Sequence, residues 1–154
     1  MKVGHRHEES IGAVIAHLPS LETSPANYDI KSIDQEFLLL KDPKGGWNFT
    51  KGHRENGETD YDTIKREIFE ETGISAYKTI GYIDKIKYSF VNNNGHSIKK
   101  QVKFYYLITD IYNVVLSNEH IDYTWLAYDQ ARALLTFNQS KFILEKARKY
   151  RSYF

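Results

Sequence analysis

Three glutamates, Glu67, Glu70 and Glu71, lie close together near the middle of this chain. If they belong to a helix, residues three and four apart share one face, so Glu67 meets both Glu70 and Glu71 there. Three crowded carboxylates repel one another, and a hard divalent cation such as Mg²⁺ relieves that repulsion because it prefers oxygen ligands. The spacing therefore predicts a metal site, with a solvated acidic helix face as the structural alternative.

The residues on either side of the glutamates predict the helix that carries them. Thr59 suits the N-cap position, and Asp62 three residues later completes a capping box with Asp in place of Glu. Gly73 suits the left-handed position that ends a helix. Upstream lies a loop marked by Gly52. We therefore expect a glycine loop followed by a short acidic helix.

The spacing of this stretch resembles the signature of the Nudix hydrolases at every specified position. It consists of Gly52, five residues, Glu58, seven residues, and then Arg66-Glu67-Ile68-x-Glu70-Glu71-x-Gly73-Ile74. The resemblance implies an enzyme that hydrolyses nucleoside diphosphates linked to another moiety. It also implies that the three helix glutamates bind metal and that Glu58 and Arg66 tie the loop to the helix.

Residues outside the signature resemble the asymmetric diadenosine tetraphosphate hydrolases, one group of Nudix enzymes. They are Phe37-Leu-Leu-Leu-Lys41, Gly46-Trp47-Asn48-Phe49, Lys51-Gly52-His53, and Ser117-Asn-Glu119-His120 with Tyr123-Thr-Trp125-Leu126. Members commonly show Phe-Pro-Lys-Gly-His before the signature, whereas this chain has Thr50 where Pro is expected. The stiffening that proline gives to the approach to the phosphate loop is therefore absent.

The resemblance implies further site residues. Glu119 matches an acidic residue that completes metal binding or serves as base, so the expected catalytic set is Glu67, Glu70, Glu119 and Lys51. Lys51 would offset charge on the transferred phosphate oxygens. A surface glutamate and an exposed lysine are the structural alternatives for Glu119 and Lys51.

Substrate contacts follow from the same resemblance. His53, Lys100 and Lys103 are expected near the phosphate chain. Solvated strand charges remain an alternative for the lysines, and a loop histidine held by its neighbours is the alternative for His53. The candidates for stacking on adenine are Tyr88, Tyr105 and Phe137. Alternating aromatic residues on a sheet usually belong to a core, which is the competing interpretation.

Hydrophobic patterns predict the elements that position these residues. Strands are expected at residues 11–17, 36–41, 76–90, 97–109, 114–116 and 123–126, and helices at 129–135 and 139–150 in addition to the acidic helix. Residues 92–95 suit a hairpin turn, and residues 18–35 read as a long loop. This order predicts an α/β (α+β) fold, a mixed central sheet in an α/β/α sandwich, as the Nudix resemblance also implies.

Length and composition narrow the setting. The 154 residues suit a single domain, 1–154. The chain has no cysteine, no signal-peptide core and no membrane-length apolar run, so we expect a cytoplasmic protein. A net charge of +1 argues against long nucleic acid and membrane partners, because a groove that follows phosphates needs a basic stripe. A monomer or a weak dimer is expected.

These features together predict a Mg²⁺-dependent hydrolase, with Mn²⁺ as the alternative ion. By resemblance, its substrate is diadenosine tetraphosphate, which would yield ATP and AMP. An RNA 5′-pyrophosphohydrolase, or a hydrolase of another nucleoside diphosphate derivative, is the alternative within enzymes. A protein that binds nucleotides as a sensor without catalysis is the non-enzymatic alternative. It is disfavoured because all the acidic positions of the Nudix signature are present.

Overall fold

The computed structural model describes residues 6–18 and 35–150 of the chain. Within them, three helices are α1 (Asp60–Thr72), α2 (Tyr128–Leu134) and α3 (Asn138–Tyr150). The strands are β1 (Arg6–His17), β2 (Glu36–Lys41), β3 (Trp47–Asn48), β4 (Thr50–His53), β5 (Lys78–Val91), β6 (Ser97–Thr109) and β7 (Asp122–Ala127). Among these helices, none combines the length and the apolar character that crossing a membrane requires.

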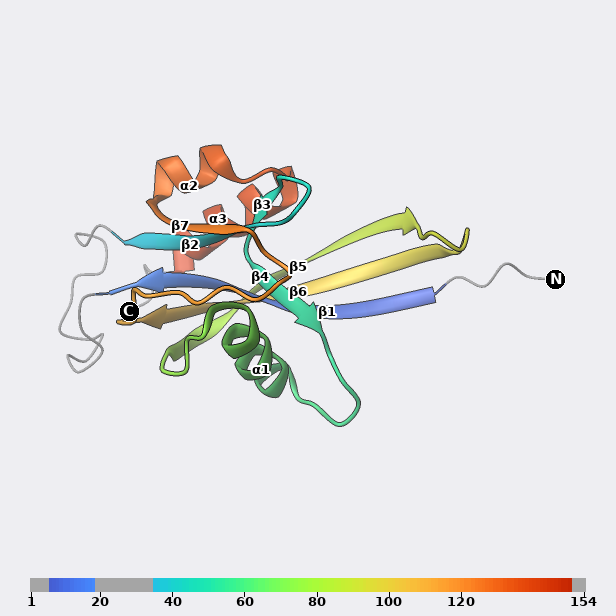
Figure 1. Cartoon of the computed structure of the whole chain (residues 1–154), viewed down its shortest axis with the longest axis horizontal. Coiled ribbons are helices and arrows are strands. Elements are labelled where there is room, and N and C mark those ends of the chain that lie inside the picture. Colours follow the sequence, from blue (N-terminus) through green and yellow to red (C-terminus); the bar gives the residue numbers. More distant parts are fainter. Residues whose placement is uncertain (1–5, 19–34, 151–154) are drawn as a thin grey trace.

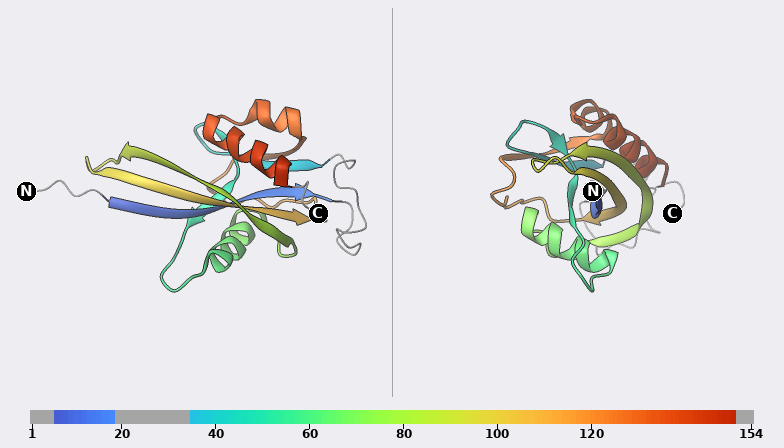
Figure 2. Two further views of the ribbon diagram at one scale, coloured as in Figure 1. Left: turned by 180° about the vertical axis from the view of Figure 1, so that it is seen from behind. Right: turned by 90° about the vertical axis from the view of Figure 1, so that its right-hand side faces the viewer.

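All the described strands belong to one mixed sheet. Its main path is β3-β2-β1-β6-β5, while β4 also pairs with β1 and β7 with β2. The central strands β1 and β6 are parallel, and the other pairs are antiparallel. Helix α1 covers one face of the sheet, and α2 and α3 cover the other (Figures 1 and 2). The predicted α/β/α sandwich is confirmed.

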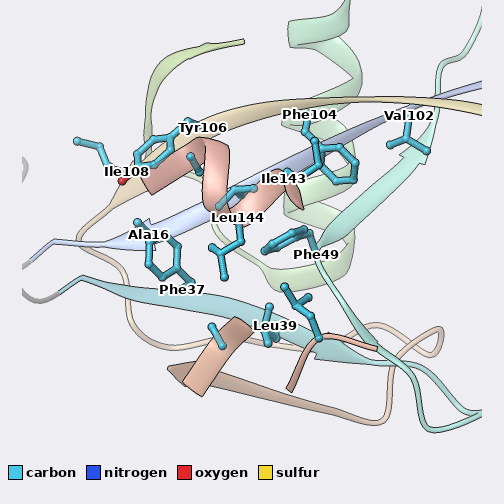
Figure 3. Close-up of a cluster of buried hydrophobic side chains, with 14 of the residues drawn as sticks. Ala16, Phe37, Leu39, Phe49, Val102, Phe104, Tyr106, Ile108, Ile143 and Leu144 are labelled. Carbon is cyan, nitrogen blue, oxygen red and sulfur yellow. The ribbon is translucent and has the colours of Figure 1, made fainter. Parts of the chain in front are cut away.

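The sheet lies between two cores, and from Ser10 onward β1 is buried on both faces. Its side chains alternate, so that Ile11, Ala13 and Ile15 join the core under α1 while Val14 and Ala16 join the core under α2 and α3. Figure 3 shows the second of these cores, in which aromatic and aliphatic side chains of the sheet meet α3. It includes Phe37, Leu39, Phe49, Phe104, Tyr106, Ile143 and Leu144. A strand inside such a sheet reads as a continuous apolar run.

Most of the predicted elements are present. The two long strands form an antiparallel hairpin from β5 to β6, and Gly95 at its turn has a φ of 77°. The strand expected at residues 114–116 is wrong. Val114 is buried in the α1 core, and the N–H of Val115 donates to the carbonyl of Thr72 at 2.9 Å, so this segment packs against the end of α1 without joining the sheet. Of the loop expected at residues 18–35, residues 19–34 lie outside the described part.

Candidate active site

Helix α1 begins and ends at the residues that the sequence predicts. The side chain of Thr59 accepts a hydrogen bond from the N–H of Asp62 at 3.2 Å, and the Asp62 carboxylate accepts one from the N–H of Thr59 at 3.0 Å. Gly73 follows the helix with a φ of 75°, and its N–H donates to the carbonyl of Phe69. The predicted capping box and glycine stop are confirmed, and they fix the ends of the helix that carries the glutamates.

An ion pair that we call the Glu58–Arg66 clasp joins the signature loop to α1. The guanidinium of Arg66 donates to both carboxylate oxygens of Glu58 at 2.8 Å, and also to the backbone carbonyl of His53 at 2.8 Å. These hydrogen bonds hold the pKa of Glu58 down at about 2. A bidentate pair of this kind fixes geometry as well as charge, so the loop has one position relative to the helix.

Glu67 lies directly against the backbone of β4. A Cβ atom at Gly52 would overlap the Glu67 carboxylate, so only glycine leaves room for that carboxylate. Arg66 donates to one Glu67 oxygen at 2.7 Å. Burial still raises the pKa of Glu67 against the effect of Arg66, and the negative charges of Glu70 and Glu119 add to the rise.

Glu71 is the buried acid of the cluster, with 3% of its surface exposed. Its Oε2 atom is buried without a hydrogen-bond partner among the described residues. Burial raises the pKa of Glu71 to about 9, and the charges of Glu67 and Glu119 add to the rise against the opposing N–H and ammonium of Lys51. A carboxyl group held this way is costly unless a ligand compensates it.

Glu70 and Glu119 stand at the open side of the cluster. The side chain of Glu70 is 57% exposed, and Glu119 is exposed in the loop between β6 and β7. Both line an open hollow of about 380 Å³ together with Lys51 and Glu67, and both line a smaller one of about 230 Å³ next to Glu71. The structure therefore brings the predicted acidic residues to one place on the surface.

The donor set of this cluster fits a hard divalent cation. In the part of the chain that the structure describes, no three acidic or histidine side chains already stand arranged around one ion position. The orphaned Oε2 of Glu71 and the mutual repulsion among Glu67, Glu71 and Glu119 are nevertheless what a cation between them would relieve. Glu70 and Glu119 are exposed, so each can turn toward such an ion, and Glu70 would then give up its 3.5 Å contact with the Arg66 guanidinium.

Lys51 lies between the acidic cluster and the strand that carries Tyr88. Its ammonium contacts the hydroxyl of Tyr88 at 3.3 Å and lies 5.6 Å from the centroid of that ring. Burial lowers the pKa of Lys51, while the nearby charges of Glu71 and Asp42 oppose that change. Lys51 is thus a partly buried cation at the edge of the hollow, and Tyr88 is its neighbour.

His53 and Lys100 are adjacent on the rim of the same hollow. The Lys100 ammonium is 3.4 Å from Nε2 of His53, and His53 is 3.4 Å from a carboxylate oxygen of Glu8. Both residues line the 380 Å³ hollow with Lys51. This group can present positive charge and hydrogen-bond donors to a phosphate chain beside the glutamates.

Lys103 and Tyr105 lie elsewhere, in a network around Asp60 at the start of α1. The Lys103 ammonium is 2.8 Å from Asp60, which also accepts the Tyr105 hydroxyl and an Arg54 guanidinium hydrogen bond at 2.6 Å. Tyr105 is largely buried in the core under α1. Neither side chain lines the hollows beside the glutamates. The structure therefore gives these two residues packing and pairing partners around Asp60, and does not bring them together with the residues that line the hollows.

Phe137, the third stacking candidate, is 51% exposed at the start of α3. Neither of the two hollows beside the glutamates includes it, and its carbonyl accepts the N–H of Ser140 and of Lys141 as the helix begins. Ser10 is a residue that the sequence analysis missed. It lines the 380 Å³ hollow from β1, and its Oγ is buried without a partner among the described residues. Ser10 precedes the apolar run at residues 11–17, and no pattern in the sequence marks it as a site residue.

Sequence comparison relates the chain to known hydrolases. The profile of the NUDIX domain matches residues 29–145. The rat asymmetrical bis(5′-nucleosyl)-tetraphosphatase is 35% identical over 124 residues, which cover 75% of this chain and 80% of the rat protein. The pig protein of the same name is 34% identical over 121 residues, with the same coverage.

Structure comparison gives the same fold. A Caenorhabditis elegans Ap4A hydrolase in a binary complex superposes with a TM-score of 0.70 at 22% identity, covering 96% of this chain and 99% of the other. An Escherichia coli dihydroneopterin triphosphate pyrophosphohydrolase also superposes with a TM-score of 0.70, at 21% identity, covering 92% and 95% of the two chains. Together with the signature geometry and the family match over most of the chain, these likenesses establish that the protein belongs to the NUDIX domain family and is a Nudix hydrolase.

Proposed function

We propose that this protein hydrolyses a phosphoanhydride bond of dinucleoside polyphosphates, with diadenosine tetraphosphate as the substrate that gives ATP and AMP. The substrate class is supported by the likeness to the rat and pig tetraphosphatases over three quarters of the chain. The observation that supports the chemistry is the buried Glu71, whose unpartnered oxygen and raised pKa a bound cation would relieve.

Mg²⁺ is the proposed cofactor, with Mn²⁺ as the alternative. Glu67, Glu70, Glu71 and Glu119 would hold it. When bound, such an ion neutralises charge on the polyphosphate and makes water more acidic. Glu71 is buried, Glu67 is partly buried, and Glu70 and Glu119 are exposed at the rim, a placement that suits both ligation and proton transfer.

The chain's own residues would then carry out the remaining steps. Glu70 or Glu119 takes a proton from the attacking water. The oxygen of that water bonds to phosphorus while the anhydride P–O bond breaks. Lys51 offsets charge on the phosphate oxygens, while His53 and Lys100 position the rest of the chain of phosphates. Tyr88, whose ring lies against Lys51, is the proposed stacking partner for an adenine base. Phe137 is a second stacking candidate, for a base that extends beyond the hollows.

A product assay tests the substrate. Purified protein is incubated with diadenosine tetraphosphate and Mg²⁺, and the nucleotides are separated by ion-exchange chromatography. Equal amounts of ATP and AMP are expected. Two molecules of ADP, or nucleotide binding without turnover in both Mg²⁺ and Mn²⁺, would contradict the proposal. Faster hydrolysis of a 5′-triphosphate RNA in the same assay would favour the RNA 5′-pyrophosphohydrolase alternative.

Glu70→Gln tests the proposed proton acceptor. A general base contributes roughly 10²–10⁴-fold, so kcat should fall by that amount. Glu145→Gln, on the exposed surface of α3, is the matched control and should retain activity. A loss of only a few-fold in kcat with unchanged Mg²⁺ affinity would remove Glu70 from the central role and leave Glu119 as the candidate.

A further inference from the structure

Ser10 is the residue at which β1 passes from the exposed end of the sheet into its core. Residues 6–9 of the strand are exposed or half-buried, whereas residues 10–16 are buried. Ser10 has 0% of its surface exposed, and its Oγ atom has no hydrogen-bond partner among the described residues. Buried polar groups are nearly always hydrogen-bonded, and alanine at this position would avoid the cost of burying the hydroxyl. This exception therefore suggests a partner that comes from outside the chain.

Ser10 faces the cationic side of the candidate active site. In an antiparallel ladder, residues directly opposite each other point to the same face of the sheet. Ser10 lies opposite His53, and Lys51, two residues before His53, lies on the same face and diagonal to Ser10. Gly52, against which the Glu67 carboxylate lies, belongs to the other face. The hydroxyl is therefore on the side of the lysine and the histidine.

Strand β6 adds a third donor to this face. Ser10 is the partner of Val102 in the parallel pairing of β1 with β6, so Lys100, two residues before Val102, shares its face. The Lys100 ammonium lies 3.4 Å from Nε2 of His53. Ser10 lines the 380 Å³ hollow together with Lys51, His53 and Lys100. The ligand that such a group of hydrogen-bond donors suits is an anion with several acceptor oxygens.

The side chains beside Ser10 can move to admit such a ligand. The side chain of His53 is 62% exposed, and that of Glu8, two residues along β1 on the face of Ser10, is 36% exposed. The two side chains contact each other at 3.4 Å. A phosphate would compete with Glu8 for His53 because both are anions. Displacement of these two side chains would open the way to the buried hydroxyl.

We propose that Ser10 is a substrate-binding residue whose hydroxyl donates a hydrogen bond to a phosphate oxygen held by Lys51, His53 and Lys100. The inference rests on the proposed function for the identity of the ligand as a polyphosphate. A lysine attracts any anion as a point charge, whereas a hydroxyl fixed on a strand adds direction without adding charge. Ser10 would therefore determine where along the hollow one phosphate group comes to rest.

The test compares two variants that each remove one buried, unpartnered hydroxyl. Ser10→Ala removes the hydroxyl at the hollow, and Thr50→Val is the matched control. Oγ1 of Thr50 is also buried without a partner in the described part of the chain, but Thr50 lines neither of the hollows beside the glutamates. Isothermal titration calorimetry measures binding of a methylene-bridged tripolyphosphate analogue, which cannot be hydrolysed, to the intact chain with Mg²⁺. Ser10→Ala should bind it roughly 10-fold more weakly or worse, and Thr50→Val should bind it as the unmodified protein does.

Two further measurements separate binding from folding. Without ligand, both variants should unfold at a temperature no lower than the unmodified protein, because each loses a buried hydroxyl that has no partner. With diadenosine tetraphosphate, Ser10→Ala should raise KM about 10-fold and change kcat little, because the hydrogen bond forms in the ground state and in the transition state alike.

Three outcomes would overturn the inference. They are no binding of the analogue by the unmodified protein, equal binding by the unmodified protein and Ser10→Ala, and equal losses in Ser10→Ala and Thr50→Val. A lower unfolding temperature of Ser10→Ala with unchanged binding would also overturn it, since the hydroxyl would then serve the fold.

Failure of the proposed function gives a different result. If binding of the analogue depends on Ser10 while diadenosine tetraphosphate is not hydrolysed, the inference stands and the proposed substrate is wrong. If diadenosine tetraphosphate is hydrolysed to ATP and AMP while Ser10→Ala binds the analogue normally, the proposed function stands and the inference is wrong.

Discussion

Two carboxylates of one signature, Glu58 and Glu71, lie in opposite environments. Glu58 receives two hydrogen bonds from Arg66, and its pKa is lowered to about 2. Glu71 is buried with an unpartnered oxygen, and its pKa is raised to about 9. The first group is ionised and fully compensated in the folded protein. The second is held where its charge is opposed by burial and by two neighbouring acids.

This contrast separates structure from function within a single motif. A compensated ion pair stabilises the geometry of the loop, and its charges need no additional ligand. A buried, uncompensated acid costs stability, and groups of that kind gather at functional sites, where a ligand supplies the missing interaction. Glu71 is therefore the residue whose environment a bound cation would change most.

The largest effect is expected from Glu71→Gln. Substitutions that only support metal ligands cost roughly 10–100-fold in metal affinity or activity, so loss of a direct ligand should cost at least that much. The metal-free variant should unfold at a temperature no lower than the unmodified protein, because an uncompensated acid has been removed. Turnover of diadenosine tetraphosphate and thermal unfolding in EDTA measure the two effects.

The matched control is Glu58→Gln, which should behave in the opposite way. It weakens the clasp, so the unfolding temperature should drop, while activity should fall less than in Glu71→Gln. Equal losses of activity and lower unfolding temperatures in both variants would contradict the assignment of a structural role to Glu58 and a metal-binding role to Glu71.

Gly52→Ala tests whether the position of Glu67 beside Glu71 is required. The new Cβ would overlap the Glu67 carboxylate and force it away from β4. The carboxylate is the far end of a flexible side chain, so it can move aside at little cost in stability, but it then leaves its place beside Glu71, and we expect activity to fall by roughly 10-fold or more. Gly45→Ala in the turn before β3 is the control for activity: a Cβ there meets no neighbouring atom, and the φ of 94° strains the alanine, so this variant should lose stability and keep its activity. Mg²⁺ affinity unchanged in Gly52→Ala would show that Glu67 can bind from another position.

The pH dependence of stability should also follow Glu71. Between its ordinary pKa of 4.5 and the raised value of about 9, the folded protein keeps a proton that the unfolded chain has lost. Unfolding is therefore favoured progressively as pH rises through that window, and the stability of the metal-free protein decreases. Unfolding temperatures from about pH 5 to about pH 9 measure this decrease as the difference between the unmodified protein and Glu71→Gln. A constant difference across the range would mean that Glu71 titrates normally.

The smallest effect is expected from Tyr105→Phe, which concerns a second compensated carboxylate, Asp60. The substitution removes one hydrogen bond to Asp60 and should lower stability by about 1 kcal/mol, with KM for diadenosine tetraphosphate unchanged. Tyr88→Leu is the comparison, because the proposed stacking role predicts a raised KM there. A raised KM in Tyr105→Phe would indicate that the hydroxyl of Tyr105 contributes to substrate binding.

Local features of the fold were predictable because they depend on neighbours in the chain. Thr59, Asp62 and Gly73 define the ends of α1 through short-range backbone geometry, and alternation along β5 and β6 predicts their hairpin. The signature spacing likewise predicts that its glutamates share one helix. The wrong prediction of a strand at residues 114–116 shows where local patterns are insufficient. An apolar triplet fits a strand or a packed loop equally well, and only a neighbouring strand decides between them.

The chemical state of the site was settled by contacts between distant segments. Residue type alone does not tell that Lys103 and Tyr105 pair with Asp60 while Lys100 reaches His53, because strand register and the packing of α1 decide which lysine faces which acid. The sequence thus determined the motif, the caps and the order of the elements along the chain. The tertiary structure decided which carboxylate is compensated and which is left buried, since burial and pairing arise only when the elements pack together.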